Sequence, residues 1–168
     1  DGSSAAGTPN TATVTLTTDE PERLDVDFGY RGLGTIGDTI WLDLDGSGET
    51  VPQADDIRLP NVEVTLTYTN PGGDDLVLVT TTDADGMYLF ENLPDGDYTV
   101  TVNPATLPAG VTPIVDPDGG ADNTSSLTLD DDPGTVGVNE GVDLDQDFAY
   151  VGTGSIGDLV WNLSLIHI

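Results

Sequence analysis

An acidic loop is the part of the sequence best suited to chemistry. The stretch DLDGSGETVPQADD covers residues 43–56. Side chains with oxygen atoms recur at every second position of its first half: Asp43, Asp45, Ser47 and Glu49. Together with Gly48, they match positions 1, 3, 5, 6 and 7 of the calcium loop that joins two helices in other proteins. The loop therefore predicts a calcium site, for which magnesium, with its tighter octahedral geometry, is a poorer fit.

The closing ligand of this loop is displaced. Position 12 of such a loop normally carries an acid, but Ala54 stands there, and Asp55 and Asp56 follow one and two residues later. A small insertion would bring Asp56 back to the ion. The alternative is an acidic turn without an ion, because aspartate and glycine are ordinary turn residues.

Other acidic groups are candidate ligands as well. The loop DPDGGAD predicts a second site, with three acids: Asp116, Asp118 and Asp122. Asp85 and its neighbour Asp83 lie in a tight turn, where a turn-forming role is the usual explanation. Asp38 lies between two isoleucines on an apolar face, and a buried carboxylate there would need a metal ion or backbone donors.

The composition excludes several classes of function. The chain has 31 acids against three arginines and no lysine, a net charge of −28. Neither nucleic acid nor an anionic membrane surface is a suitable partner, since little positive charge is present to neutralise phosphates. No apolar run reaches the ~18 residues of a membrane-spanning helix. An excess of this size also destabilises a compact state, so we expect divalent cations or salt to compensate it, unless the chain is disordered.

An enzyme is not expected. The sequence has no cysteine and no lysine, and its single histidine, His167, lies in a tail (SLIHI) outside the sequence pattern. A catalytic triad or a Schiff base therefore cannot be assembled. The paired carboxylates of a glycosidase are compatible with so many acids. Both tryptophans, however, match one another between copies of a repeat as core residues do, which leaves no aromatic platform for a sugar.

The repeat is visible at an offset of 120 residues. FGYRGLGTIGDTIW begins at Phe28 and FAYVGTGSIGDLVW at Phe148; eight of these positions are identical, and the residues just before each phenylalanine agree as well. This pattern predicts a tandem array with a unit of about 120 residues. We assign residues 1–33 to the end of a preceding copy, residues 34–152 to a complete copy and residues 153–168 to the start of the next, with an off-pattern tail.

The fold class follows from alternating apolar and polar residues. About seven short strands are expected, at residues 62–68, 76–82, 87–90, 98–102, 127–129 and 142–150 among others. Asp-Gly at residues 85–86 predicts a hairpin between two of them. In the last strand, four apolar residues should face inward: Val142, Leu144, Phe148 and Tyr150. Three acids should then face solvent, where one of them could reach the ion of a neighbouring loop: Asp143, Asp145 and Asp147. We predict an all-β, Ig-like or prealbumin-like Greek-key sandwich.

The motif order resembles that of a known family. The segments IGDTIWLDLDGSG, LPNVEVTLT, TTTDADGMYLFENLPDGDYTV and LDQDFAY are similar to the SdrD B-like repeat domain, within the wider group of Cna B-type, prealbumin-like sandwiches. The resemblance implies an extracellular, calcium-loaded stalk module. It also implies that five residues belong to its calcium loop: Asp43, Asp45, Ser47, Glu49 and Asp56. The lysine–asparagine isopeptide bond of many Cna B-type relatives is impossible here without lysine.

Two functions are therefore expected as alternatives. The first is a calcium-stabilised structural module of a secreted or surface-anchored protein, whose partners are neighbouring copies of the same repeat in a stalk or filament. The second is an adhesin-type module that recognises protein or carbohydrate through its loops. The second requires an exposed apolar or aromatic patch, and the sequence alone does not indicate one.

Overall fold

The computed structural model describes residue 15, residue 18 and residues 32–130 and 139–154. The chain divides into two compact units, Asp1–Arg31 and Gly32–Ile168, and the fold described below is that of the second. Most of residues 1–33 and 153–168, which we assign to neighbouring copies, lie outside the described residues. In the described part, no helix has the length and apolar character that crossing a membrane requires.

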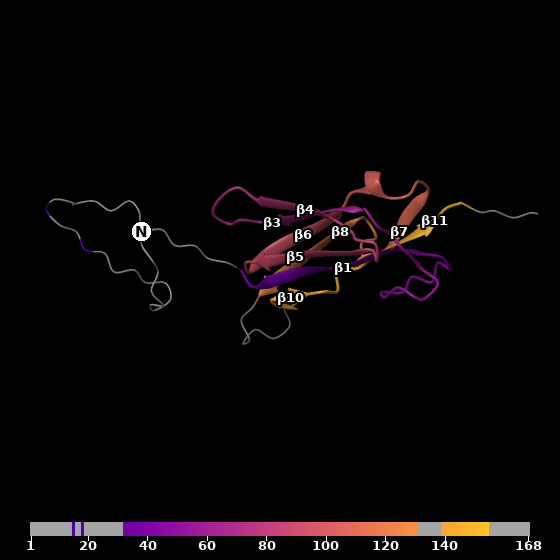
Figure 1. Cartoon of the computed structure of the whole chain (residues 1–168), viewed down its shortest axis with the longest axis horizontal. Helices are drawn as coiled ribbons and strands as arrows, with labels where there is room; N and C mark the ends of the chain where they lie inside the picture. The colour runs from indigo at the N-terminus through magenta and orange to yellow at the C-terminus, as the bar shows by residue number, and fades with distance from the viewer. Residues whose placement is uncertain (1–14, 16–17, 19–31, 131–138, 155–168) are drawn as a thin grey trace, which may run out of the picture. The chain divides into compact units, whose positions relative to one another are not determined.

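The regular elements described in the second unit are strands, apart from one short 3₁₀ helix (Figure 1). Its described elements, in chain order, are β1 (Gly34–Asp43), β2 (Ile57–Arg58), β3 (Glu63–Tyr68), β4 (Leu76–Thr81), β5 (Met87–Leu93), β6 (Gly96–Val102), the short 3₁₀ helix η1 (Pro104–Thr106), β7 (Val111–Val115), β8 (Thr124–Asp130), β9 (Asn139–Glu140), β10 (Val142–Asp143) and β11 (Phe148–Gly152). The predicted all-β sandwich is confirmed, with more and shorter strands than expected, because several of them have only two residues.

The first sheet is organised around β1, its longest strand. On one side β1 pairs antiparallel with β5 and β2, and on the other it pairs parallel with β10 and β11. Strand β7 then pairs antiparallel with β11 at the edge. The first and last strands of the copy are thus parallel neighbours, with Ile40 opposite Phe148 and Asp43 opposite Val151.

The second sheet has the order β4-β3-β6-β8-β9. Its alternation follows the sequence pattern, since Val64 and Leu66 of β3 and Val100 of β6 are at most 1% exposed while threonines separate them on both strands. The inward faces of the two sheets enclose one core, whose members are large aliphatic and aromatic residues: Ile36, Ile40, Leu59, Val62, Val64, Leu66, Tyr88, Phe90, Leu93, Tyr98, Val100, Val102, Leu129, Phe148 and Tyr150. Burial of this apolar surface is the main term that stabilises the sandwich.

The turn at residues 83–86 does not form the predicted hairpin. Strand β4 before it pairs with β3, whereas β5 after it pairs with β1 in the other sheet. The reason is buried Thr82, whose hydroxyl donates to the Leu59 carbonyl at 2.6 Å and accepts from the Val62 N–H at 2.9 Å. These bonds hold the end of β4, and the Gly86 carbonyl then accepts from the Ile40 N–H of β1 at 2.9 Å. The turn therefore connects the two layers.

The predicted orientation of residues 142–147 is wrong for four of them, whereas Asp145 is exposed as expected. Val142 and Leu144 are about half exposed, whereas Asp143 and Asp147 are 3% and 8% exposed. The cause is an irregular stretch: between the pairs Ile36–Asp143 and Ile40–Phe148, β1 has three residues and the opposite segment has four. The extra residue breaks the two-residue alternation and turns carboxylates inward. From Phe148 onward the expected burial of the two aromatic residues is confirmed.

Candidate cation sites

The first acidic loop begins where β1 ends. Asp43, the last residue of β1, is 2% exposed, and its carboxylate shapes the loop. Its Oδ1 accepts from the N–H groups of Asp45 at 3.1 Å and Gly46 at 2.7 Å, and its Oδ2 accepts from Gly48 N–H at 2.8 Å. Burial alone would raise the pKa of Asp43, but these backbone donors outweigh it and hold the pKa below its usual value.

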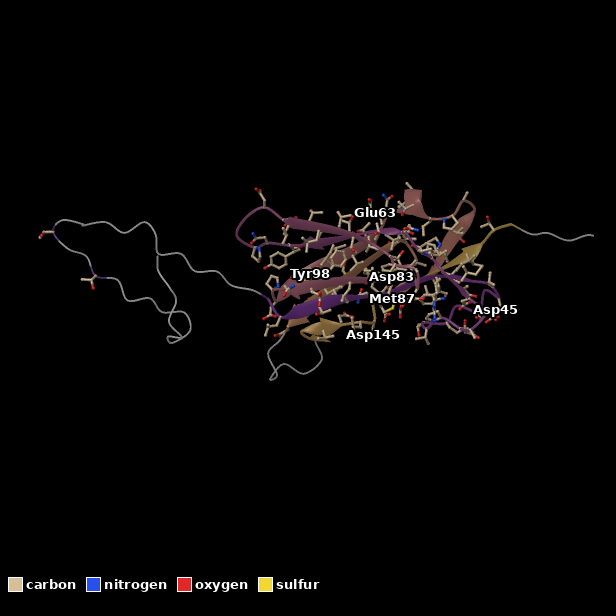
Figure 2. The ribbon with its side chains drawn as sticks, viewed as in Figure 1. Asp45, Glu63, Asp83, Met87, Tyr98 and Asp145 are labelled. Carbon is tan, nitrogen blue, oxygen red and sulfur yellow. The ribbon has the colours of Figure 1, made fainter. Side chains whose placement is uncertain are left out.

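Three acids of this loop lie close together. Carboxylate oxygens of Asp43, Asp45 and Glu49 all lie within 4.8 Å of one another, a grouping found nowhere else among the described residues. The Ser47 hydroxyl donates to the Glu49 carboxylate, so the fourth expected ligand lies beside the trio. Figure 2 shows Asp45 at the end of the sandwich away from Tyr98. Oxygen donors at this spacing suit a hard divalent cation such as calcium.

Asp56 closes the loop in a different way from the one expected. Its Oδ1 accepts from Leu44 N–H at 3.2 Å and its Oδ2 from Gln53 N–H at 2.7 Å. Both carboxylate oxygens of Asp56 thus accept hydrogen bonds from backbone N–H groups, and Asp56 does not join the acidic trio. The side-chain amide of Gln53 in turn donates to Glu49. Asp56 therefore acts as a brace that ties the two ends of the loop together.

The second acidic loop lies between β7 and β8. Asp118 accepts from Gly120 N–H at 3.3 Å and from Ser126 N–H at 3.2 Å, so both of its oxygens are engaged. Asp122 accepts from the backbone and the hydroxyl of Thr124. Asp116 is 6% exposed, and its Oδ2 accepts from Asp122 N–H at 2.9 Å. The three predicted ligands share one loop, but two of them are used largely as turn-forming acceptors.

Asp38 lies beside the segment that precedes β11. Burial raises the pKa of Asp38, and the negative charge of Asp145 raises it further. The Thr39 hydroxyl, which donates to Asp38 at 2.8 Å, partly opposes this rise. Asp147 accepts from Thr39 N–H at 3.1 Å, and burial together with the charge of Asp38 raises its pKa to about 7. The positive charge of Arg58 partly offsets both effects. Asp38 thus belongs to a cluster separate from the first loop.

Asp85 lies in the exposed turn between β4 and β5. The carboxylate of its neighbour Asp83 accepts from the N–H groups of Asp85 and Met87, each at 2.9 Å. Figure 2 places Asp83 and Met87 close together near the middle of the sandwich. These contacts support the turn-forming role, and Asp85 does not join the trio of the first loop.

Two features escaped the sequence reasoning. One is the burial of Asp143 and Asp147, for which Gln146 was an available signal, since it interrupts the alternation of aspartates with apolar residues. The other is a set of apolar side chains on β4 and β5 that are about half exposed: Val77, Val79, Met87 and Leu89. Both strands lie at the edges of their sheets. The alternation pattern therefore does not tell whether their outward faces contact solvent or a binding partner.

Curated relatives cover most of the chain at modest identity. Serine-aspartate repeat-containing protein F of Staphylococcus epidermidis is 30% identical over 95% of this chain and 9% of its own length. Serine-aspartate repeat-containing protein E of Staphylococcus aureus is 31% identical over 90% and 12%, and the bone sialoprotein-binding protein of the same species is 32% identical over 90% and 12%. The chain spans about a tenth of the length of these relatives.

Two solved structures match the chain at TM-scores below 0.5. The plantain pollen allergen Pla l 1 gives a TM-score of 0.49 at 11% identity, covering 75% of this chain and 98% of its own. The major pilin SpaD of Corynebacterium diphtheriae gives 0.44 at 15%, covering 78% and 34%. The SdrD B-like domain family matches residues 34–149, which is most of the chain and nearly all of the copy described above. The chain belongs to the SdrD B-like domain family.

Proposed function

We propose that this chain is a calcium-stabilised spacer module in the stalk or filament of a secreted or cell-surface protein, without enzymatic activity. The observation that supports this most strongly is the parallel pairing of β1 with β11. Parallel neighbours run in the same direction, so the copy starts with β1 at one end of the sandwich and finishes with β11 toward the other (Figure 1). Copies that enter at one end and leave at the other extend a chain in one direction.

The same pairing suits a module under tension. A pull on the two ends of the copy would draw β1 and β11 in opposite directions along their common axis. The hydrogen bonds between them, from the Ile40–Phe148 pair to the Asp43–Val151 pair, would then be loaded together in shear. Strands that are peeled apart lose their bonds one at a time, so shear resists a given force better. The chain has no cysteine or lysine for a covalent clamp.

Calcium would take the place of such a clamp at the first loop. Asp43, Asp45 and Glu49 would hold the ion, with Ser47 beside them, and their oxygens already lie within 4.8 Å of one another. An ion there offsets the repulsion among the three carboxylates. Because Asp43 is also the last residue of β1, the ion would fix the loop to the end of the strand that carries the load.

Electron microscopy of a protein with several tandem copies tests the spacer role. The ten residues of β1 span about 33 Å at ~3.3 Å per residue, so each added copy should lengthen the particle by at least that amount. Particles in calcium should be rods of evenly spaced beads whose length grows linearly with copy number. Compact particles, in which copies fold back on one another in calcium, would rule the spacer role out.

An adhesin-type binding module is the second candidate. The half-exposed side chains of Val77, Val79, Met87 and Leu89 on edge strands β4 and β5 favour it, since apolar surface of this kind often marks a contact site. One relative is named for binding bone sialoprotein. Reproducible binding of the chain to a protein or glycan array, lost in a Val77→Lys and Val79→Lys variant, would support this function. Absence of binding on both arrays would reject the binding function and leave the spacer role as the remaining candidate.

A further inference from the structure

A glycine at the start of the copy shows what packs on the joint between copies. In the 120-residue repeat, Gly32 is equivalent to Gly152. A Cβ atom on Gly32 would lie 2.0 Å from the carbonyl group of Leu93 and 2.3 Å from the backbone nitrogen of Pro94. No side chain fits at such distances from backbone atoms, so glycine is needed there for the turn between β5 and β6 to approach.

Gly152 has no such neighbour in the copy that it ends. It is the last residue of β11, where it pairs with Val111, and it is exposed. A Cβ atom on Gly152 would meet no atom within 4 Å in the described part of the chain. Gly152 also lacks a positive φ, so its backbone conformation does not call for glycine. The equivalence with Gly32 supplies the missing neighbour, which is the turn between β5 and β6 of the following copy.

The joint is too short for two copies to avoid contact. Strand β11 ends at Gly152, and Gly154 is equivalent to Gly34, the first residue of β1. Only Thr153 separates the two strands, so the Cα atoms on either side of it are at most about 7 Å apart. Thr153 is itself fixed, because its N–H and its hydroxyl both donate to the Gly110 carbonyl at 2.8 Å. The next copy therefore begins directly at the end of this one.

The surface beside this joint is hollow and uncharged. A cavity of about 410 Å³ lies at the end of the sandwich where Figure 1 shows β7 and β11 together. Its lining includes apolar residues of β7 and of the segment before it, among them Leu107, Pro108, Val111 and Pro113. None of the described residues that line the cavity carries a charge. In a chain of net charge −28, a second acidic copy meets little repulsion at such a surface.

We propose that consecutive copies meet in a fixed joint, in which the following copy's turn, equivalent to residues 93–96, packs on Gly152 and covers this cavity. The inference rests on the tandem arrangement of the proposed spacer, and it names the contact that holds neighbouring copies at a set angle. The turn suits this role because the Tyr98 hydroxyl donates to the Pro94 carbonyl at 2.6 Å and holds the turn in one shape. The Pro94 side chain is exposed and apolar, as the lining of the cavity is apolar.

A protein with two complete copies, joined through residues 152–154, tests whether the joint is fixed. Because the chain has no cysteine, Thr81→Cys in each copy gives two exposed positions for spin labels. Double electron–electron resonance in calcium should give one narrow distribution of distances between the labels. Ala109→Glu in the first copy places a charge in the cavity lining and should widen the distribution about twofold or more. Ala84→Glu, at an exposed position outside that lining, is the matched control and should leave the distribution unchanged.

Gly152→Ala tests the contact with the turn. In the 168-residue chain it should leave the melting temperature unchanged, since the added methyl group meets open space. In the two-copy protein it should lower the first melting transition by about 5 °C or more, because the methyl group meets the turn of the following copy.

The outcomes separate the fixed joint from the spacer role. A broad distribution with the unaltered joint overturns the proposal, and so does a Gly152→Ala variant that melts like the unaltered two-copy protein. Equal widening by Ala84→Glu and Ala109→Glu also overturns it, because general repulsion between acidic copies would then explain the effect. Evenly spaced rods in electron microscopy together with a broad distribution would reject the joint and keep the spacer role, whereas compact particles would reject the spacer role itself.

Discussion

Replacing Asp45 with asparagine should change stability in opposite directions with and without calcium. Asp45 Oδ1 accepts from Ser47 N–H at 3.0 Å, and the asparagine oxygen can keep this bond. The substitution therefore removes mainly a negative charge. That charge lies within 4.8 Å of oxygens of Asp43 and Glu49, so without a cation it repels both. Any loop that gathers three acids for an ion carries this conflict when the ion is absent.

The magnitudes follow from the spacing. Two unit charges 4.8 Å apart repel by about 0.9 kcal/mol in water, and screening at an exposed loop lowers this, so relief from two neighbours amounts to about 1 kcal/mol. With calcium at ~1,000 times its dissociation constant, the intact site gains about 4 kcal/mol. At roughly 3–5 °C per kcal/mol for a domain of this size, wild type should melt about 12–20 °C higher in calcium than in chelator.

Calorimetric melting of both proteins in calcium and in chelator gives the four values needed. In chelator, Asp45→Asn should melt at the wild-type temperature or a few degrees above it, and in calcium well below wild type. Asp85→Asn, which removes a charge from the exposed turn between β4 and β5, should keep the full calcium gain. An equal calcium gain in Asp45→Asn and wild type would refute the role of this loop, and so would a wild-type melt that calcium does not move.

Three further predictions concern the calcium-free fold. Thr82→Val should lower the free energy of unfolding in urea by about 2–4 kcal/mol, because two buried backbone groups lose their partner, while exposed Thr81→Val should be nearly neutral. Gly86→Ala should lower the free energy of unfolding by more than about 3 kcal/mol, since its Cβ would lie 2.6 Å from a backbone oxygen of β1. Gly48 has a similar positive φ but open space around it, so Gly48→Ala should lower that free energy by only about 1 kcal/mol. Equal losses for the two variants in the same assay would contradict this explanation. Asp147 has a pKa of about 7 when folded and near 3.8 when unfolded. Between these values the folded state holds a proton that the unfolded state has lost, so stability in chelator should fall as pH rises, and Asp147→Asn should flatten that part of the profile relative to wild type.

The sandwich itself was predictable from local patterns. The alternation through Val62, Val64 and Leu66 reports directly which side of a strand is buried, and β3 follows it. The partner of a strand is not encoded in the same way. The Asp-Gly turn at residues 85–86 is a good hairpin signal. The hydroxyl of Thr82, just before this turn, nevertheless bonds to the Val62 N–H and so keeps the end of β4 beside β3 in one sheet. That contact joins residues about 20 positions apart, which a local pattern does not report.

The acidic loop was predictable for a similar reason. Asp43, Asp45 and Glu49 come together because the turn is short and its own backbone donates to Asp43, so spacing along the chain decides spacing in the fold. Asp116 and Asp147 meet around a cavity only through the pairing of β7 with β11, and an extra residue before β11 turns Asp147 inward. A group of residues brought together from separate strands leaves no spacing signal in the sequence.

The location of the acidic segments bears on how the proposed spacer would work. One begins at the last residue of β1, one at the residue after β7 and one ends at the residue before β11, and these three strands are neighbours in one sheet. Repulsion among the carboxylates would thus act where the proposed load passes between β1 and β11. Calcium loops of extracellular modules bind in the range of about 10⁻⁴–10⁻³ M. At such affinities the free energy gained from the ion rises and falls with the surrounding calcium, so the stiffness of the array would depend on its environment as well as on its sequence.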